Sequence, residues 1–373
     1  MAVARDLDLL VIGGGPAGLA TAIEARLAGF QTLVIDRRKP PIDVACGEGL
    51  MPSGVEGLRR LGVEISEVEH AVFRGIRYLD GDLAAEARFK RSFGVGVRRT
   101  VLHRALHRRA LDVGVDFRWG ETARAMKPGG VETDAGLMRA RWLVAADGRL
   151  SKLRKWAGLE GRTPTRQRFG VRRHYGVAPW SEFVEVYWSD DAEAYVTPVG
   201  PETVGVAVLS CETPVDFDRL LRRFPPLRTR LEDAPEVSSD RGAGPFGHRP
   251  SGVVRDNLIL VGDASGSLDP ITGEGLSIAL AQAQALIRSL ERGRIEEYAK
   301  AHRRIWRLPR LLTGLLLIAE QHRWLRRTVV RLFVGFPSVF SILVNVAAFG
   351  RPSLILPGIK TVRSASPIAR SKP

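Results

Sequence analysis

The sequence predicts an α/β protein with three parts: a parallel-sheet domain, a mixed β-sheet domain inserted into it, and a helical C-terminal tail. Three observations predict this fold. A glycine-rich turn joins an apolar strand to a helix near the N-terminus, an aromatic stretch with strand-like alternation lies mid-chain, and apolar runs edged with arginine follow residue 301. At roughly 150 residues per domain, 373 residues suffice for two or three domains.

The composition is that of an ordinary globular protein, with 45% apolar and 26% charged residues. Two cysteines, Cys46 and Cys211, lie far apart in sequence, which excludes a disulfide scaffold and a cysteine-rich zinc module. The sequence contains no H-E-x-x-H motif, and its N-terminus does not resemble a signal peptide. We therefore expect a cytoplasmic protein without a metal site.

A nucleotide-binding fingerprint lies near the start of the chain. Apolar residues 7–12 form a predicted strand that runs into a G-x-G-x-x-G made by Gly13, Gly15 and Gly18, and a helical segment over 19–28 follows. The first glycine allows a tight turn, the second lets a pyrophosphate approach the backbone, and the third lets helix and strand pack closely. The helix N-terminus then faces the phosphates. This order predicts a Rossmann-like domain.

A second predicted strand, over 31–35, ends at Asp36. A carboxylate at this point can accept hydrogen bonds from both ribose hydroxyls of a dinucleotide, and we expect the neighbouring Arg37 to contact the same cofactor. Another G-x-G-x-x-G, over 242–247, follows no predicted strand and precedes Pro250, so we interpret it as a loop. A second, permanently bound dinucleotide is therefore not predicted.

Two later apolar segments both end at an aspartate. Residues 142–146 lead into Asp147, and residues 257–261 lead into Gly262 and Asp263. A single aspartate at a strand end is commonly a turn former. Together with the fingerprint, however, the two segments resemble the FAD-dependent flavoprotein hydroxylase superfamily, whose fold is that of para-hydroxybenzoate hydroxylase.

The resemblance covers most of residues 7–290 and implies FAD as the cofactor, with NAD(P)H as a transient reductant. It implies that Asp263 binds the ribityl chain and that Asp147 lies near the pyrophosphate. Arg99 matches the arginine that opens a helix and contacts the flavin in this family, and Arg98 is the alternative.

A glycine-rich loop precedes the next predicted helix, which covers residues 277–290. The loop contains Thr272, Gly273 and Gly275, and in the superfamily it lies against the flavin ring. A glycine loop at a helix N-terminus suits an anion or an electron-rich ring. The simpler alternative is a plain helix start with Thr272 as its cap.

Two motifs are similar to the geranylgeranyl reductase branch of the superfamily: C-G-E-G-L over 46–50 and T-G-E-G over 272–275. That branch reduces isoprenoid double bonds and carries an aromatic-x-Trp-x-Phe-Pro motif over its substrate cavity. Here only Tyr195 and Pro198 match this motif, and its Trp and Phe are absent. The chain also resembles bacterial FAD-dependent monooxygenases that act on hydrophobic aromatic polyketides.

An aromatic stretch between residues 175 and 195 predicts a binding region for a hydrophobic small molecule. Side chains alternate along 183–188, so one face is expected to pack while the other can line a cavity. The candidate substrate residues are Tyr187, Tyr195 and Pro198, although aromatic residues on strands more often pack in a core.

Three polar side chains, Cys46, Glu185 and His174, have two interpretations each. Cys46 follows the second predicted strand and is either a proton-delivering or substrate-placing residue at the flavin edge, or a small buried hydrophobe. Glu48 is the second catalytic candidate. Glu185 is expected to face solvent, with a pocket position as the alternative, and His174 is expected at an exposed strand end rather than as a base.

The motifs predict a discontinuous FAD-binding domain and a substrate-binding domain. The FAD-binding domain covers 1–72, 96–160 and 250–300, the substrate-binding domain covers 73–95 and 161–249, and the tail covers 301–373.

The positive charge of the chain is concentrated in its tail. Residues 301–373 hold 13 Lys and Arg but a single acid, Glu320, and so contribute +12 of the net charge of +15. The arginines flank apolar runs such as 332–350, which favours an anionic membrane surface over a nucleic acid as partner. That run is long enough to span a bilayer, but glycine, proline and polar residues interrupt it, so an amphipathic or re-entrant cover over the substrate mouth is favoured. We therefore expect peripheral attachment at the inner face of a membrane.

These observations predict an FAD-dependent oxidoreductase. The leading expectation is a monooxygenase that hydroxylates a hydrophobic aromatic substrate with NAD(P)H and O2. The alternative is a geranylgeranyl reductase-like enzyme that reduces a carbon–carbon double bond of a lipid or quinone. A membrane-associated binding protein that has lost its flavin is the third hypothesis.

Overall fold

The computed structural model describes residues 7–90 and 92–349. A six-stranded sheet carries the N-terminal fingerprint and has the strand order β18-β19-β12-β1-β2-β8. All neighbouring strands run parallel except β18, which pairs antiparallel with β19. The strands are β1 (Leu9–Ile12), β2 (Thr32–Asp36), β8 (Asp116–Trp119), β12 (Trp142–Ala145), β18 (Val254–Arg255) and β19 (Leu258–Leu260).

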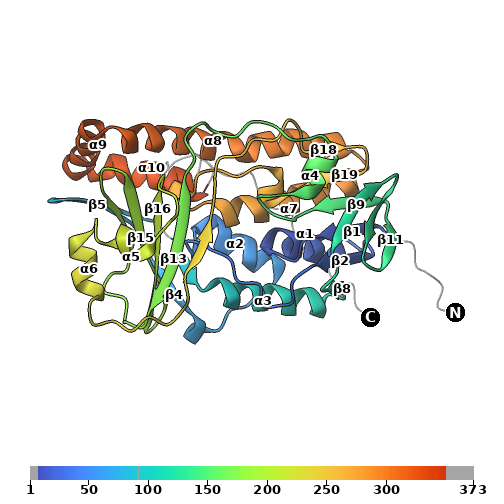
Figure 1. Ribbon diagram of the computed structural model, residues 1–373, viewed down its shortest axis with the longest axis horizontal. Helices are drawn as coiled ribbons and strands as arrows, with labels where there is room; N and C mark the ends of the chain where they lie inside the picture. Colours follow the sequence, from blue (N-terminus) through green and yellow to red (C-terminus); the bar gives the residue numbers. More distant parts are fainter. Residues whose placement is uncertain (1–6, 91, 350–373) are drawn as a thin grey trace, which may run out of the picture.

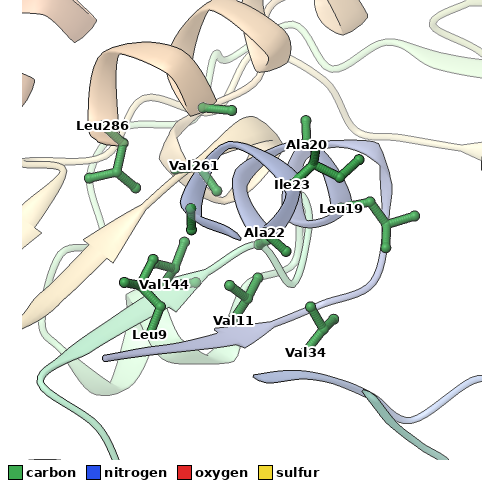
Figure 2. Packing of buried hydrophobic residues seen from close by; sticks show 14 of the residues in the cluster. Leu9, Val11, Leu19, Ala20, Ala22, Ile23, Val34, Val144, Val261 and Leu286 are labelled. Carbon is green, nitrogen blue, oxygen red and sulfur yellow. The ribbon is translucent and has the colours of Figure 1, made fainter. Parts of the chain in front are cut away.

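Helices pack on this sheet to form the largest core. In Figure 2, α1 (Pro16–Leu27) lies over β1, and Leu19 and Ala22 lie on its strand side, near Val11 and Val34. Its other neighbours are α3 (Arg99–Asp112) and α7 (Gly275–Glu291), and α2 (Pro52–Leu61) packs on α7. Because both faces of the sheet are covered at its centre, the central strands β1, β12 and β19 are apolar throughout. The predicted α/β fold with a Rossmann-like domain is confirmed.

A seven-stranded mixed sheet lies beside the first, at the left of Figure 1, and has the order β17-β13-β16-β15-β14-β5-β6. Its strands are β5 (Gly75–Asp80), β6 (Leu83–Arg88), β13 (Phe169–Tyr175), β14 (Val184–Trp188), β15 (Ala192–Gly200), β16 (Thr203–Ser210) and β17 (Arg241–Ala243). Helices α5 (Phe217–Leu221) and α6 (Pro225–Leu231) cover one face. The short β17 corrects the expectation of a pure loop over 242–247. The domain boundaries themselves stay a prediction.

Two three-stranded sheets complete the β structure. One has the order β3-β7-β4, from β3 (Gly49–Leu50), β4 (His70–Phe73) and β7 (Gly94–Val97). It follows the C-G-E-G turn and contacts β15 of the seven-stranded sheet and helix α2. The other has the order β11-β10-β9, from β9 (Ala123–Lys127), β10 (Gly130–Thr133) and β11 (Gly136–Arg139). Helix α4 (Lys152–Trp156) and the short helical turns η1 (Glu67–Glu69), η2 (Gly262–Ser265) and η3 (Pro270–Thr272) lie in the connections.

The C-terminal tail forms three helices that pack on the rest of the chain. Helix α8 (Ile295–Gln321) runs along both large sheets, as Figure 1 shows, and α9 (Arg323–Gly335) and α10 (Pro337–Phe349) pack on β6. Arg326 of α9 is 2% exposed and bonds Asp80, Ser189 and Asp190. Asn345 of α10 bonds the backbone of Arg88 and Lys90. The described part of the tail is therefore packed against the rest of the protein.

Within residues 7–90 and 92–349, no single helix has the length and apolar character needed to cross a membrane. Helices α9 and α10 meet these criteria only as a pair, and the pair is bent by 105°. The break falls at Phe336 and Pro337, because proline cannot continue the preceding helix. Residues 350–373, which belong to the predicted tail, lie outside the described residues.

Candidate active site

One large cavity of about 1320 Å³ lies where the six-stranded sheet, the seven-stranded sheet and the tail helices meet. Most residues predicted from the sequence line it, namely Gly13, Gly15, Asp36, Arg37, Cys46, Glu48, Arg99, Asp147, Tyr195, Gly262, Asp263, Thr272, Gly273 and Gly275. Gly18, Tyr187 and Pro198 lie outside this lining. The carboxyl ends of parallel strands are the usual place for a nucleotide ligand, and this cavity occupies that edge.

The glycine loop has the close contacts that its motif requires. Gly13 has φ of +114°, and a Cβ at this position would lie 2.2 Å from the carbonyl oxygen of Ala146. A Cβ on Gly18 would lie 1.9 Å from the carbonyl oxygen of Gly13, so Gly18 allows α1 to pack against the loop. Around Gly15, in contrast, the nearest atom to such a Cβ is Nη2 of Arg99 at 3.8 Å. The loop is therefore closed on the protein side and open toward the cavity.

Asp36 lies at the end of β2, as predicted, and its carboxylate organises the loop beside it. Its Oδ2 accepts a hydrogen bond from the backbone N–H of Gly14 at 2.9 Å, and its Oδ1 accepts one from Arg38 N–H at 2.8 Å. Oδ1 also lies 3.5 Å from Arg38 Nε, whereas Oδ2 keeps a second lone pair and can still accept from a ribose hydroxyl.

Arg99 is the arginine that the geometry favours for a phosphate contact. It opens α3 at the base of the cavity and is 8% exposed, and its Nε has no hydrogen-bond partner among the described residues. Burial lowers the pKa of its guanidinium, while the charges of Cys46, Asp263 and Glu48 oppose that effect. A buried guanidinium with unpartnered donors facing a glycine loop fits the pyrophosphate of FAD.

Two aspartates on neighbouring strand ends also have unused hydrogen-bonding capacity. Asp263 is exposed to the cavity, and its enclosed surroundings raise its pKa, with Arg149, Arg99 and Arg154 opposing the rise. Asp147 accepts from Lys152 N–H, while its Oδ1 has no partner among the described residues. Acceptors that lack donors fit the hydroxyls of a ribityl chain. The residues present therefore fit FAD.

The loop that precedes α7 places small residues on the cavity wall. Asp269 caps the turn η3 through Ile271 N–H, and Gly273 follows with φ of +67°. Both Gly273 and Gly275 are exposed to the cavity, which leaves room for a flat ring. Thr272 does not cap α7, because the residue before that helix is Glu274 and no side chain bonds the helix end. The simpler alternative for Thr272 was therefore wrong.

The C-G-E-G turn is fixed by Glu48, which sits in the left-handed backbone region with φ of 59°. Its Oε1 accepts from the backbone N–H of Arg99 at 2.7 Å, and its Oε2 lies 2.5 Å from His174 Nε2. Arg172 Nη1 lies 3.1 Å from His174 Nδ1 and can only donate, so Nδ1 accepts and Nε2–H donates to Glu48. Glu48 thereby holds the turn against α3 and β13.

His174 corrects the expectation of an exposed strand-end histidine, because it is 1% exposed and inside this network. Cys46 is half-buried on the cavity wall, and its Sγ accepts from Glu48 N–H at 3.3 Å. Burial raises the pKa of the Cys46 thiol, and the positive charge of Arg99 opposes the rise. The thiol therefore keeps its proton at neutral pH.

Sequence reasoning missed a buried ionic network beneath Tyr195. The Tyr195 hydroxyl donates to Glu193 Oε2 at 2.5 Å, and Arg168 donates to both Glu193 and Asp269 at 3.0 Å. Burial and the Glu193 charge raise the pKa of Tyr195 well above its usual value. Asp269 begins the loop that carries Gly273, so this network ties the seven-stranded sheet to the cofactor loop. The signal in the sequence is Glu193 two residues before Tyr195, a spacing that places both side chains on one face of a strand.

Tyr187 and Glu185 differ from expectation. Along β14, Val184 and Val186 line the cavity, and Tyr187 packs on the opposite face with α5 and α6. Glu185 is 2% exposed rather than solvent-facing, because it accepts hydrogen bonds from Arg77, Trp180 and Tyr187. The predicted alternation along the strand is correct, but Tyr187 lies on the face away from the cavity.

Apolar side chains of the tail extend the cavity away from the cofactor residues. Three helices supply them: Leu312, Leu315, Leu316, Ile318 and Ala319 from α8, Leu325, Val329, Leu332 and Phe333 from α9, and Phe340, Leu343, Val344 and Ala347 from α10. We call this part the tail cleft. It has no charged side chain in its lining, so it suits the long apolar part of a ligand.

The fold and the site together define a flavin-binding protein of the dinucleotide-binding α/β class. Residues 6–240 match the family described as "FAD binding domain", which covers more than half of the chain. The chain therefore belongs to the FAD-binding-domain family and is an FAD-dependent oxidoreductase.

Relatives and solved structures agree with this assignment. The chain is 30% identical over 309 residues to the menaquinone reductase of Mycobacterium tuberculosis, with 75% of each chain covered. It is 28% identical over 298 residues to digeranylgeranylglycerophospholipid reductase 1 of Methanothermobacter thermautotrophicus, with 73% of each covered. A flavoprotein/dehydrogenase from Cytophaga hutchinsonii has a similar fold, with a TM-score of 0.78, 19% identity and coverage of 92% and 93%.

Proposed function

We propose that this enzyme reduces a carbon–carbon double bond in a lipophilic isoprenoid or prenylated quinone. One observation carries the proposal: the cavity that holds the FAD-fitting residues continues without interruption into the tail cleft. Its volume of about 1320 Å³ exceeds the roughly 300–1,000 Å³ of common ligand pockets, so it has room for cofactor and substrate together. A long apolar chain fills such a cleft better than a compact aromatic ring.

The similarity to reductases supports the same reaction. The two reductase relatives are named for menaquinone and for a digeranylgeranylglycerophospholipid, and both names imply lipids with isoprenoid chains. This reverses the order of the sequence-based expectations, in which hydroxylation of an aromatic substrate led. The experiment described next must therefore distinguish reduction of a double bond from hydroxylation.

The proposed reaction adds a hydride to one carbon of the double bond and a proton to the other. When bound, FAD reduced by NAD(P)H supplies the hydride. The protein orients the alkene between the cofactor loop and the tail cleft and keeps water away from it. Cys46 holds a proton at Sγ on the cavity wall, and Glu48 fixes the turn that carries it. We propose Cys46 as the proton donor and Tyr195 as a wall of the substrate site.

The test uses purified FAD-loaded enzyme, NADPH or NADH, and a prenylated quinone or isoprenoid lipid, with and without oxygen. A product heavier by about 2 mass units that forms without oxygen supports reduction, because one hydride and one proton are added. A product heavier by about 16 mass units that requires oxygen contradicts the proposal and supports hydroxylation. Deuterium from solvent at one carbon would identify the position of proton delivery.

We also propose that the tail helices rest on the inner, anionic face of a membrane, from which lipophilic substrate reaches the tail cleft. Large apolar residues outside the cavity lining are exposed along the tail helices: Leu311, Trp324, Phe336, Val339 and Ile342. Arg303, Arg304, Arg307 and Arg331 are exposed beside them. Each contributes about 1 kcal/mol near an anionic leaflet, whereas Arg326 is committed to buried Asp80.

Liposome flotation tests this surface. The protein should float with anionic vesicles at low salt, and added salt should weaken the electrostatic part. A variant that replaces the four exposed arginines with glutamine should float less at low salt, since about 4 kcal/mol of attraction is removed. Protein that stays in solution with anionic vesicles at low salt would contradict the membrane proposal while leaving the reductase proposal intact.

A further inference from the structure

Helix α8 carries a second group of polar side chains that the cofactor site does not use. Trp306 is 2% exposed and lines the cavity, yet its Nε1–H has no hydrogen-bond partner among the described residues. The Arg310 guanidinium lies over the Trp306 ring, 4.8 Å from its centroid. A buried indole N–H normally donates to an acceptor, so the unpartnered Trp306 Nε1–H indicates that a ligand supplies this acceptor.

Positive charge gathers at this indole without a compensating carboxylate. Arg310 is half-buried, its Nε lacks a partner, and neither Arg310 nor Arg249 forms an ion pair within residues 7–90 and 92–349. Burial lowers the pKa of Arg310, and the nearby charge of Arg249 lowers it further. A Cβ on Gly266 would lie 3.1 Å from the carbonyl oxygen of His248 and 3.2 Å from the Trp306 ring, so the backbone next to Arg249 lies near the same indole, and the Arg249 side chain is exposed.

A stack of Arg310 on Trp306 does not by itself account for this arrangement. A cation–π contact contributes about 0.5–2 kcal/mol and leaves the N–H groups of the guanidinium unpartnered. It gives no reason for a second arginine close by, because two like charges repel each other. Arg310 Nε and Trp306 Nε1 are both buried atoms without a partner among the described residues, and buried polar groups are normally hydrogen-bonded.

From these observations we propose that Arg310, Arg249 and Trp306 Nε1–H bind a phosphate or diphosphate group at the edge of the active-site cavity. Two guanidinium groups and one neutral donor match the acceptor oxygens of such an anion. The group belongs either to the head of an isoprenoid lipid whose chain lies in the tail cleft or to the nucleotide that reduces FAD. The assignment of this anion to a lipid rests on the reductase function proposed above, whereas the anion site itself does not depend on that function.

The binding test uses the full chain loaded with FAD, so that the cofactor site is filled, and inorganic pyrophosphate as the probe. Calorimetry should show binding to the wild type and at least a tenfold loss in Arg310→Gln and in Arg249→Gln. Trp306→Phe keeps an aromatic ring and should also weaken binding. Lys300→Gln is the matched control, because Lys300 is an exposed cation on α8 ten residues, about 15 Å, before Arg310, and its affinity should stay within twofold.

Competition then distinguishes the two sources of the anion. Geranyl diphosphate should displace pyrophosphate where geraniol does not, if the lipid supplies the phosphate, and NADPH should displace it, if the nucleotide does. Failure of both to compete, or equal pyrophosphate affinity in all variants, overturns the site and leaves an adventitious ion only. Since no turnover is measured, this failure is separate from a failure of the reductase assay.

Discussion

A buried ion pair links α9 to the seven-stranded sheet, and its contribution to the stability of the protein can be tested directly. Arg326 and Asp80 are 2% and 4% exposed, and Arg326 Nε lies 3.0 Å from Asp80 Oδ2. Replacing Arg326 with Met removes the cation and leaves a buried carboxylate without its partner. Loss of one member of a buried pair costs about 3–5 kcal/mol of unfolding free energy.

Arg327→Met is the matched control, because it removes the neighbouring arginine from a pair with exposed Asp82. An exposed pair contributes under about 1 kcal/mol. Urea unfolding with saturating FAD, followed by circular dichroism, measures both variants. Arg326→Met should unfold at clearly lower urea, and adding Asp80→Asn should recover part of the loss because no unpaired charge remains. Equal unfolding midpoints for the two single variants would refute the stabilising role of the ion pair between Arg326 and Asp80.

Three further predictions concern the cavity. Asp263→Ala should lower the affinity for FAD by roughly tenfold or more, because one charged hydrogen-bond acceptor is lost, and flavin fluorescence on titration measures it. Cys46→Ala should keep FAD yet lower product formation relative to NADPH oxidation; unchanged coupling in a folded variant would remove Cys46 from the site. Burial raises the pKa of Glu274 to about 7 from its usual 4.5. Because folded protein then binds more protons than unfolded protein, stability should fall by about 3 kcal/mol as pH rises from 4.5 to 7, and Glu274→Gln should abolish that slope, whereas Glu291→Gln should not.

The parts of the fold that sequence predicted best are those with local causes. The strand, glycine turn, helix and aspartate of the fingerprint follow one another within residues 7–36, and each has a chemical reason for its position. The strand ends at Asp147 and Gly262 were found because apolar runs stop there. All of these residues meet at one edge of the sheet, and simple topology requires that of parallel strands.

The parts that sequence did not predict depend on contacts between distant residues. Glu48 and His174 are 126 positions apart, and Arg326 and Asp80 are 246 apart. Nothing in the neighbourhood of His174 or Glu185 indicates burial, because a polar residue on a strand normally faces water. Their partners come from other elements, so only the assembled sheets show that these side chains are satisfied inside the protein.

The charged tail shows why composition alone misled on one point. Its arginines suggested a single basic surface, yet the structure divides them by partner. Arg326 is buried against two aspartates, Arg310 lies on Trp306 at the cavity, and others such as Arg304 are exposed on α8. A different measurement therefore tests each group: the unfolding free energy tests Arg326, anion binding tests Arg310, and vesicle binding tests the exposed arginines. One segment can therefore close the cleft, bind the polar end of a substrate and face a membrane, since these tasks use different faces of its helices.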